Sequence, residues 1–263
     1  MDFAGPGKPL TQKALEDAGG IVGIPAAAMW AVIHVESSGA GYLDDRRPKI
    51  LFERHLFHRA TGGRFDATHP DISNPRSGGY GLGGAHQYSR LAKAATLDRK
   101  AALSSTSWGL GQVLGSNFGI AGFNDVEDMV TKMVHSERLQ LLGMFNFIEG
   151  INLGVHLKNR NWLNFALGYN GQNAEENGYP QKLQAAFEVF NNGSPPDILI
   201  RIAQLALTFL GHNPGGVDGL FGNNTRRALQ AFQNAEGMQQ TTELTGVASD
   251  ALVKKAFDGD LDD

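Results

Sequence analysis

Two glutamates are the side chains of this sequence best suited to acid–base chemistry, and the first is Glu36. It follows Met29 by seven residues and Ile33 by three, so on a helix its carboxyl group shares their apolar face. Burial disfavours the charged carboxylate, and the negative end of the helix dipole acts in the same direction, so we expect a raised pKa for Glu36. A carboxylic acid that stays protonated near neutral pH suits general-acid catalysis on a glycosidic oxygen. The alternative on this pattern is a solvated glutamate at a frayed helix end.

The second candidate is Glu53, which lies 17 positions later in the run ILFERH. Arg54 and His55 follow it directly, and cationic or hydrogen-bonding neighbours favour an ionised carboxylate. Two carboxylates held in opposed environments are typical of a glycosidase. Spacing alone favours a different interpretation of Glu53, a surface glutamate paired with Arg54.

Three other motifs are set aside. Residues 79–84 (GYGLGG) fit a dinucleotide-binding fingerprint, but NPRS precedes them where a strand is needed. Residues 34–36 (HVE) fit half of a deaminase signature, but the chain has no cysteine to complete it. His55 and His58 could share a helical face, yet no third ligand follows at a diagnostic spacing. We therefore expect no cofactor, no metal and no serine or cysteine nucleophile.

The elements that must position these residues are mainly helical. Apolar alternation is scarce, so any sheet is small. A long helix is expected to open with a capping box at Asn124 and Glu127 and to end at Gly150. A stretch rich in Gly, Pro, Asn and Asp, residues 61–84, predicts a long loop. Further helices are expected at residues 11–18, 25–36, 161–167 and 180–190.

A domain boundary is expected at residues 191–197 (NNGSPPD), because consecutive prolines bar a helix there. This divides the chain into residues 1–194 and residues 195–263. The second part predicts three short helices, and so small a core more often binds than catalyses. The first of these helices carries Ile198, Ile202, Leu205 and Phe209, with Gly211 just beyond it; the second has Asn224 as its N-cap; the third holds Ala251, Leu252 and Phe257.

Composition narrows the classes of protein. The chain has 263 residues, of which 41% are hydrophobic and 19% charged, and this composition argues against a disordered or fibrous protein. The absence of cysteine excludes disulfides and thiolate metal sites. A net charge of −4 supplies no field that attracts nucleic acid or anionic lipid. We expect no nucleic-acid partner, no stable membrane association, neither a signal peptide nor a membrane span, and a monomer.

Four ordered blocks resemble a known family. They are residues 35–39 (VESSG), 47–55 (RPKILFERH), 107–115 (SWGLGQVLG) and 169–171 (YNG). Together they are similar to the N-acetylmuramidase endolysins of tailed bacteriophages, within the lysozyme-like superfamily. Residues 217–225 (VDGLFGNNT), followed by the pairs at 228–229 and 232–233, resemble a three-helix peptidoglycan-binding module.

The resemblance implies a mainly α protein: a lysozyme-like catalytic domain with a small β element, followed by a three-helix bundle. Glu36 is then the general acid and Glu53 the second carboxylate, acting on the β-1,4 bond between N-acetylmuramic acid and N-acetylglucosamine in peptidoglycan glycan strands. Gln112, Tyr169 and Asn170 match positions that line the sugar cleft. The implied location is the host cytoplasm, and then the cell wall once a membrane-pore protein releases the enzyme.

Two alternatives remain open on the sequence. A lytic transglycosylase resembles lysozyme but uses one glutamate, here Glu36, and leaves a 1,6-anhydro product. A non-catalytic wall-binding or phage structural protein would make both glutamates incidental.

Overall fold

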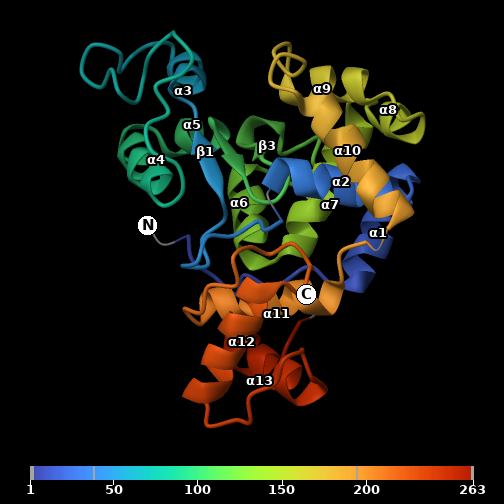
Figure 1. Ribbon diagram of the computed structural model, residues 1–263. Coiled ribbons are helices and arrows are strands. Elements are labelled where there is room, and N and C mark those ends of the chain that lie inside the picture. The colour runs from blue at the N-terminus through green and yellow to red at the C-terminus, as the bar shows by residue number, and fades with distance from the viewer. Residues whose placement is uncertain (1–2, 38, 194, 262–263) are drawn as a thin grey trace.

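The computed structural model describes residues 3–37, 39–193 and 195–261. Met1, Asp2 and Ser194, on which the expectations about a signal peptide and the domain boundary partly rest, lie outside these residues. Within the described ranges the protein has 13 α-helices and a three-stranded sheet, so the predicted mainly α class is confirmed (Figure 1). The helices are α1 Gln12–Val22, α2 Ala26–Ser37, α3 Arg54–Thr61, α4 His86–Leu97, α5 Arg99–Ser104, α6 Val126–His135, α7 Glu137–Gly150, α8 Gly154–Lys158, α9 Trp162–Asn170, α10 Tyr179–Asn192, α11 Ile198–Phe209, α12 Asn223–Ala235 and α13 Gly246–Phe257.

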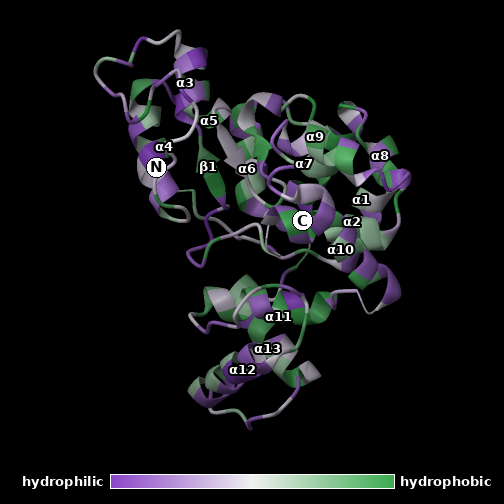
Figure 2. Cartoon of the chain, turned by 45° about the horizontal axis from the view of Figure 1, so that its top comes forward, coloured by the Kyte–Doolittle hydropathy of each residue, from purple (hydrophilic) through white to green (hydrophobic). Residues whose placement is uncertain are grey.

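The sheet is small, as predicted, and antiparallel in the order β1-β2-β3. Its strands are β1 Ile50–Phe52, β2 Thr106–Trp108 and β3 Val113–Leu114. Ile50 pairs with Trp108, and Ser107 pairs with Leu114. Figure 2 shows β1 as a hydrophobic strand, and the side chains of Phe52 and Trp108 are fully buried. The sheet is therefore fixed to the core, and its ends provide rigid positions for polar residues.

The prediction of one long helix between Asn124 and Gly150 is wrong. Two helices, α6 and α7, occupy this stretch, and the chain breaks at Ser136, whose backbone is extended. The Ser136 side chain accepts a hydrogen bond from the Leu139 amide and so caps α7. A continuous apolar period hid the break, because a serine in the sequence fits either a helix interior or a cap.

Two predicted caps are displaced, the first by one residue and the second by two. Asp125, rather than Asn124, is the N-cap of α6, and its carboxylate accepts from the Asp128 amide. Helix α12 begins at Asn223 behind Gly222, so Asn224 is not its N-cap. The loop predicted at residues 61–84 lies between α3 and α4 as expected, while helices α3, α4, α5 and α8 were not predicted.

Two hydrophobic clusters organise the core. The larger one unites α1, α2, α7, α9 and α10 with the sheet. The smaller one belongs to α11, α12 and α13, which we call the C-terminal helices and which lie together at one end of the molecule (Figure 1). Ala40 and Tyr42, from the segment after α2, are part of the smaller cluster. The C-terminal helices are thus packed against the rest of the chain directly after the helix that ends at Ser37.

Among the described residues, no single helix is long and apolar enough to cross a membrane. The pair formed by α1 and α2 passes the same test of length and composition, with a bend of 104° between the two helices.

Candidate active site

Glu36 lies in the last turn of α2, one residue before the helix ends. Most of α2 is buried, because the helix packs against α10 on one side and α1 on another. Glu36 itself is only half-buried, since it lines a cavity of about 320 Å³. The cavity is lined by Glu36, Ser37, Leu43, Lys49, Ile50, Gly84 and Gln112. A core helix thus delivers one carboxyl group into an open space.

Burial raises the pKa of Glu36 to about 7, as the sequence predicted. The opposing influence is Asn170, whose Nδ2 donates a hydrogen bond to Glu36 Oε1 at 2.9 Å and favours the ionised carboxylate. Burial wins because this one amide does not replace the water that the carboxylate loses. Near neutral pH, Glu36 is therefore divided between its protonated and ionised forms, and it can give up a proton.

Asn170 and Tyr169, at the end of α9, lie beside Glu36, although neither is among the residues that line the cavity. The Tyr169 hydroxyl donates to the Gly111 carbonyl at 2.6 Å, and the ring stacks on Phe165 at 5.4 Å between centroids. Burial, and secondarily the charge of Glu36, raise the pKa of Tyr169 well above its usual value. Tyr169 therefore lies close to Glu36, but its hydroxyl is used to hold the turn that leads to Gln112. One polar atom of Asn170 is unsatisfied: its Oδ1 is buried without a hydrogen-bond partner among the described residues.

Gln112 faces the cavity from the turn between β2 and β3. Its backbone has a φ of 47°, a left-handed conformation that is uncommon outside glycine. Its side-chain Nε2 donates to the carbonyls of Lys49 at 3.1 Å and Gly109 at 2.9 Å, which ties this turn to the start of β1. A strained, polar residue held at a cavity wall is typical of a ligand-binding position.

The structure does not bring Glu53 into this cavity. Glu53 is the N-cap residue of α3, directly after β1, and it does not line the space that Glu36 lines. Ile50 does line it, and Glu53 lies three residues farther along, which at strand spacing is about 10 Å. The Glu53 carboxylate lies 3.6 Å from His55 Nδ1 and 3.5 Å from the Tyr80 hydroxyl, so its neighbours in the described structure are these groups rather than Arg54.

The glycine-rich run at residues 79–84 borders the cavity through Gly84. Its anchor is Gln87, a fully buried side chain on α4 that the sequence did not single out. Gln87 Nε2 donates to the carbonyls of Tyr80 and Leu82, both at 2.7 Å, and its Oε1 accepts from the Phe52 amide at 3.2 Å. The loop is thereby fastened to β1, and it connects the region of Glu53 with the cavity of Glu36.

Lys49 is a further cavity residue that sequence reasoning missed. Its Nζ donates to the Ser37 carbonyl at 2.8 Å, and burial lowers the pKa of this ammonium group. Lys49 was part of the motif RPKILFERH, but nothing in the spacing distinguishes it from a surface lysine. Its position beside Ser37 places a positive charge on the wall that Glu36 shares.

Comparisons with known proteins agree with this geometry. The N-acetylmuramidase family matches residues 25–191, and the putative peptidoglycan binding domain matches residues 198–254. Among solved structures, the crystal structure of Burkholderia AP3 phage endolysin is similar, with a TM-score of 0.66 and 37% sequence identity over 70% of this chain and 72% of that chain. The comparison with curated proteins gives no match.

Proposed function

This chain belongs to the N-acetylmuramidase family and is a glycoside hydrolase of peptidoglycan, and we propose that Glu36 is its general acid. The observation that carries the proposal is the cavity of about 320 Å³ that exposes one half-buried carboxyl group with a pKa raised to about 7. Such a group donates its proton to the glycosidic oxygen as the β-1,4 bond between N-acetylmuramic acid and N-acetylglucosamine breaks. Glu36 is ionised after the transfer, and the Asn170 amide stabilises the carboxylate that remains.

Gln112, Tyr169 and Asn170 are proposed to bind the sugar. Asn170 Oδ1 is buried without a partner in the described structure, so it can accept a hydrogen bond from a hydroxyl or acetamido N–H group of the glycan. Gln112 lines the cavity wall, and because its Nε2 already donates to Lys49 and Gly109, its Oε1 is the atom that can accept a hydrogen bond from the sugar. Tyr169 contributes by holding Gly111, and through it the turn of Gln112, in place.

Glu53 is proposed as the second carboxylate. Its place in the sequence motif supports this role, and the loop that contacts it through Tyr80 continues to the cavity at Gly84. The observation that Glu53 does not line the cavity favours a second candidate, a lytic transglycosylase reaction that uses Glu36 alone. In that reaction the sugar's own hydroxyl group replaces water as the nucleophile, so no second carboxylate is needed.

The biological role we propose is that of an endolysin, as the similar Burkholderia AP3 phage protein is named. The division into a catalytic domain at residues 1–194 and a peptidoglycan-binding domain at residues 195–263 belongs to this proposal. Peptidoglycan is the partner that the C-terminal match supports. We further propose a monomer that binds neither nucleic acid nor membranes, and that reaches the wall from the host cytoplasm when a membrane-pore protein releases it.

The test is mass spectrometry of the products from purified peptidoglycan. A muramidase leaves reducing N-acetylmuramic acid ends, a glucosaminidase leaves reducing N-acetylglucosamine ends, and a transglycosylase leaves 1,6-anhydro ends. Glu36→Gln keeps the shape of the side chain but removes the proton, and it should lower the rate at least about 100-fold. Unchanged activity of folded Glu36→Gln would overturn the proposal. Full activity of Glu53→Gln together with anhydro ends would select the transglycosylase.

A further inference from the structure

The C-terminal helices contact the catalytic part of the chain at the segment that follows Glu36. We propose that Arg201, on α11, is a positioning residue for catalysis: it fixes the end of the helix that carries Glu36. The peptidoglycan-binding part of the chain then contributes to the chemical step itself, in addition to holding the enzyme on the wall. This inference rests on the proposed role of Glu36 as the acid.

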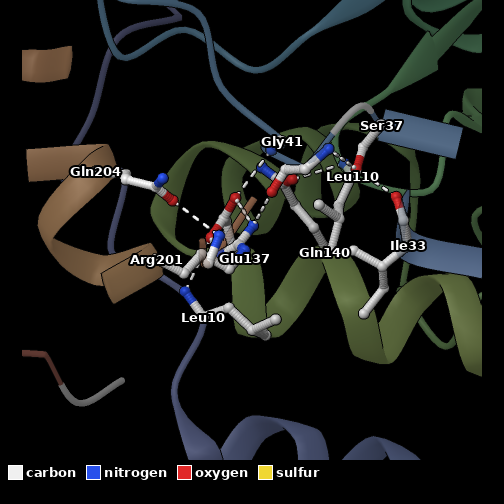
Figure 3. Close-up of polar contacts among 11 residues, drawn as sticks. Leu10, Ile33, Ser37, Gly41, Leu110, Glu137, Gln140, Arg201 and Gln204 are labelled. Carbon is white, nitrogen blue, oxygen red and sulfur yellow. Dashed lines mark hydrogen bonds and ion pairs between the residues drawn. The ribbon is translucent and has the colours of Figure 1, made fainter. Parts of the chain in front are cut away.

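Arg201 forms a buried ion pair with Glu137, the first residue of α7 (Figure 3). The side chains are 1% and 0% exposed. Nη1 donates to Oε2 at 2.5 Å and Nη2 donates to Oε1 at 2.8 Å, which is the bidentate geometry that arginine forms with a carboxylate. The pair joins the segment matched by the peptidoglycan-binding domain to the segment matched by the N-acetylmuramidase family.

The Glu137 carboxylate also accepts hydrogen bonds from the backbone of two other segments. Its Oε1 accepts from the Gly41 amide at 2.8 Å, and its Oε2 accepts from the Leu10 amide at 2.9 Å. Burial alone would raise the pKa of Glu137, but the charge of Arg201 and these hydrogen bonds outweigh burial and lower it. The carboxylate is therefore ionised, and it holds Gly41 only five residues beyond Glu36.

Gly39 is held from the same side, even closer to Glu36. Arg201 Nη2 donates to the Gly39 carbonyl, and Ser37 Oγ accepts from the Gly39 amide at 3.2 Å. A Cβ atom on Gly39 would lie 2.1 Å from the Val217 carbonyl oxygen, so the backbone of the C-terminal part packs directly on this residue. Gly39 also has a φ of 97°, which a side chain would strain. Only glycine allows this approach.

These contacts form a short path from Arg201 to the acid. Arg201 holds Gly39, the Gly39 amide holds the Ser37 side chain, and Ser37 directly follows Glu36. The Ser37 hydroxyl donates to the Ile33 carbonyl at 2.6 Å, and its carbonyl accepts from Lys49. Ser37 itself lines the cavity. A shift at Arg201 would therefore alter the depth and the orientation of the Glu36 carboxyl group.

A role confined to tethering does not require this arrangement. A tether raises the local concentration of substrate through the length of its linker, and it needs no fixed contact with the catalytic part. Burying an arginine and a glutamate carries a large desolvation cost, and apolar residues of similar volume often give equal or greater stability. The buried pair is thus better explained by the geometry that it imposes beside Glu36 than by stability alone.

The experiment measures kcat and KM on soluble glycan fragments of four sugars, so that tethering to the insoluble wall does not contribute to the rate. Arg201→Lys keeps one charge but loses the bidentate contact, and Arg201→Met removes the charge. We expect kcat to fall about 10- to 100-fold in Arg201→Met and less in Arg201→Lys, with KM within about twofold of wild type. The limb of the pH profile near pH 7 should move to lower pH, because a displaced Glu36 is less buried.

Leu205→Ala is the matched control. Leu205 lies one turn after Arg201 on α11 and is fully buried in the smaller cluster, so its truncation weakens the C-terminal helices but leaves the ion pair. With folding checked by circular dichroism, Leu205→Ala should keep the wild-type pH profile. The inference is overturned if both arginine variants keep wild-type kcat and lose only binding to sacculi, or if Leu205→Ala shifts the pH limb equally.

If Arg201→Met does not fold, Arg201→Lys alone tests the positioning role of Arg201. Glu36→Gln on the same fragments separates this inference from the proposed function. Activity in Glu36→Gln would contradict the proposed role of Glu36 as the acid. An inactive Glu36→Gln together with fully active arginine variants would contradict only the positioning role of Arg201.

Discussion

Glu36 and Glu137 are both withdrawn from water, yet their surroundings shift their pKa values in opposite directions. Glu137 is fully buried and receives hydrogen bonds from Arg201 and from the amides of Leu10 and Gly41, and its pKa is lowered. Glu36 is less buried but receives a hydrogen bond from Asn170 alone among the described residues, and its pKa is raised to about 7. The charge of Arg201 and the larger number of donors, rather than the depth of burial, separate the two residues.

This difference supports the proposal that Glu36, and not Glu137, is the acid. A carboxylate whose lone pairs are all used is a structural anion, because losing its charge would leave several donors unsatisfied. A carboxyl group with one donor and an open cavity retains its proton near neutral pH and can exchange it. Glu137, with four hydrogen bonds, therefore has the surroundings of a structural anion, and Glu36, with one, has the surroundings that the proposed acid requires.

The largest expected effect on stability is at the ion pair. Glu137→Leu and Arg201→Met should each lower the free energy of unfolding by about 3–5 kcal/mol, because each leaves the other charge buried without its partner. The double variant should cost at least about 2 kcal/mol less than the sum of the two, since no charge then remains unpaired. Urea denaturation at pH 7 measures all three.

The pH dependence of this pair has a definite sign. The folded-state pKa of Glu137 is lowered, so the stability that Glu137 contributes is present above its unfolded pKa and is lost as the pH falls through its folded pKa. The double variant should lack this acid-sensitive part of the unfolding curve. Strict additivity of the two single variants would contradict the view that they form one unit.

Glu36→Gln should have the opposite effect on stability. Because the folded-state pKa of Glu36 is raised, its contribution is fully present below the unfolded pKa of about 4.5 and is lost as the pH rises through about 7. The variant cannot ionise at this position. Its free energy of unfolding minus that of wild type should therefore be larger at pH 8 than at pH 4, by on the order of 1–3 kcal/mol. Thermal unfolding of both proteins at both pH values measures this, and a difference between variant and wild type that is no larger at pH 8 than at pH 4 would contradict it.

The sequence predicted the burial of Glu36 but not the burial of Glu137, for a physical reason. Glu36 lies on the same helical face as Met29 and Ile33, so its burial follows from a local period of 3.6 residues. Glu137 meets Arg201 across 64 positions, and nothing in the local pattern indicates that two charged residues share a buried site. Contacts between distant segments set the electrostatics of Glu137, and such contacts are not encoded in spacing.

The same distinction explains most differences between the predicted and the observed fold. The helices α1, α2, α9, α10, α11, α12 and α13 were predicted because their apolar faces and turn residues are local signals. The break at Ser136 was not, because the N-cap of α7 is fixed in part by Lys8, whose carbonyl accepts from the Glu137 amide at 2.9 Å. That Glu53 does not line the cavity of Glu36 follows from the path of β1, which the local pattern does not specify.

A smaller change at Asn170 tests whether donor number sets the pKa of Glu36. Asn170→Ala removes the hydrogen bond that favours the ionised carboxylate, so the pKa of Glu36 should rise above about 7. The limb of the activity profile near pH 7 should then move to higher pH by less than about one unit, the size expected for one amide contact. Asn164→Ala, at an exposed position on the same helix, is the control and should leave the limb in place.

The smallest effect is expected at Tyr80, and it extends the comparison to Glu53. The Tyr80 hydroxyl lies 3.5 Å from the Glu53 carboxylate, at the limit of a hydrogen bond, so Tyr80→Phe should change the free energy of unfolding by less than about 0.5 kcal/mol. If Glu53 is the second carboxylate, removing this weak donor should change the rate on peptidoglycan by less than about threefold, while Glu53→Gln lowers it far more. Equal losses in the two variants would mean that the contact itself matters, and that Tyr80 rather than the Glu53 charge is the group the substrate meets at this end of β1.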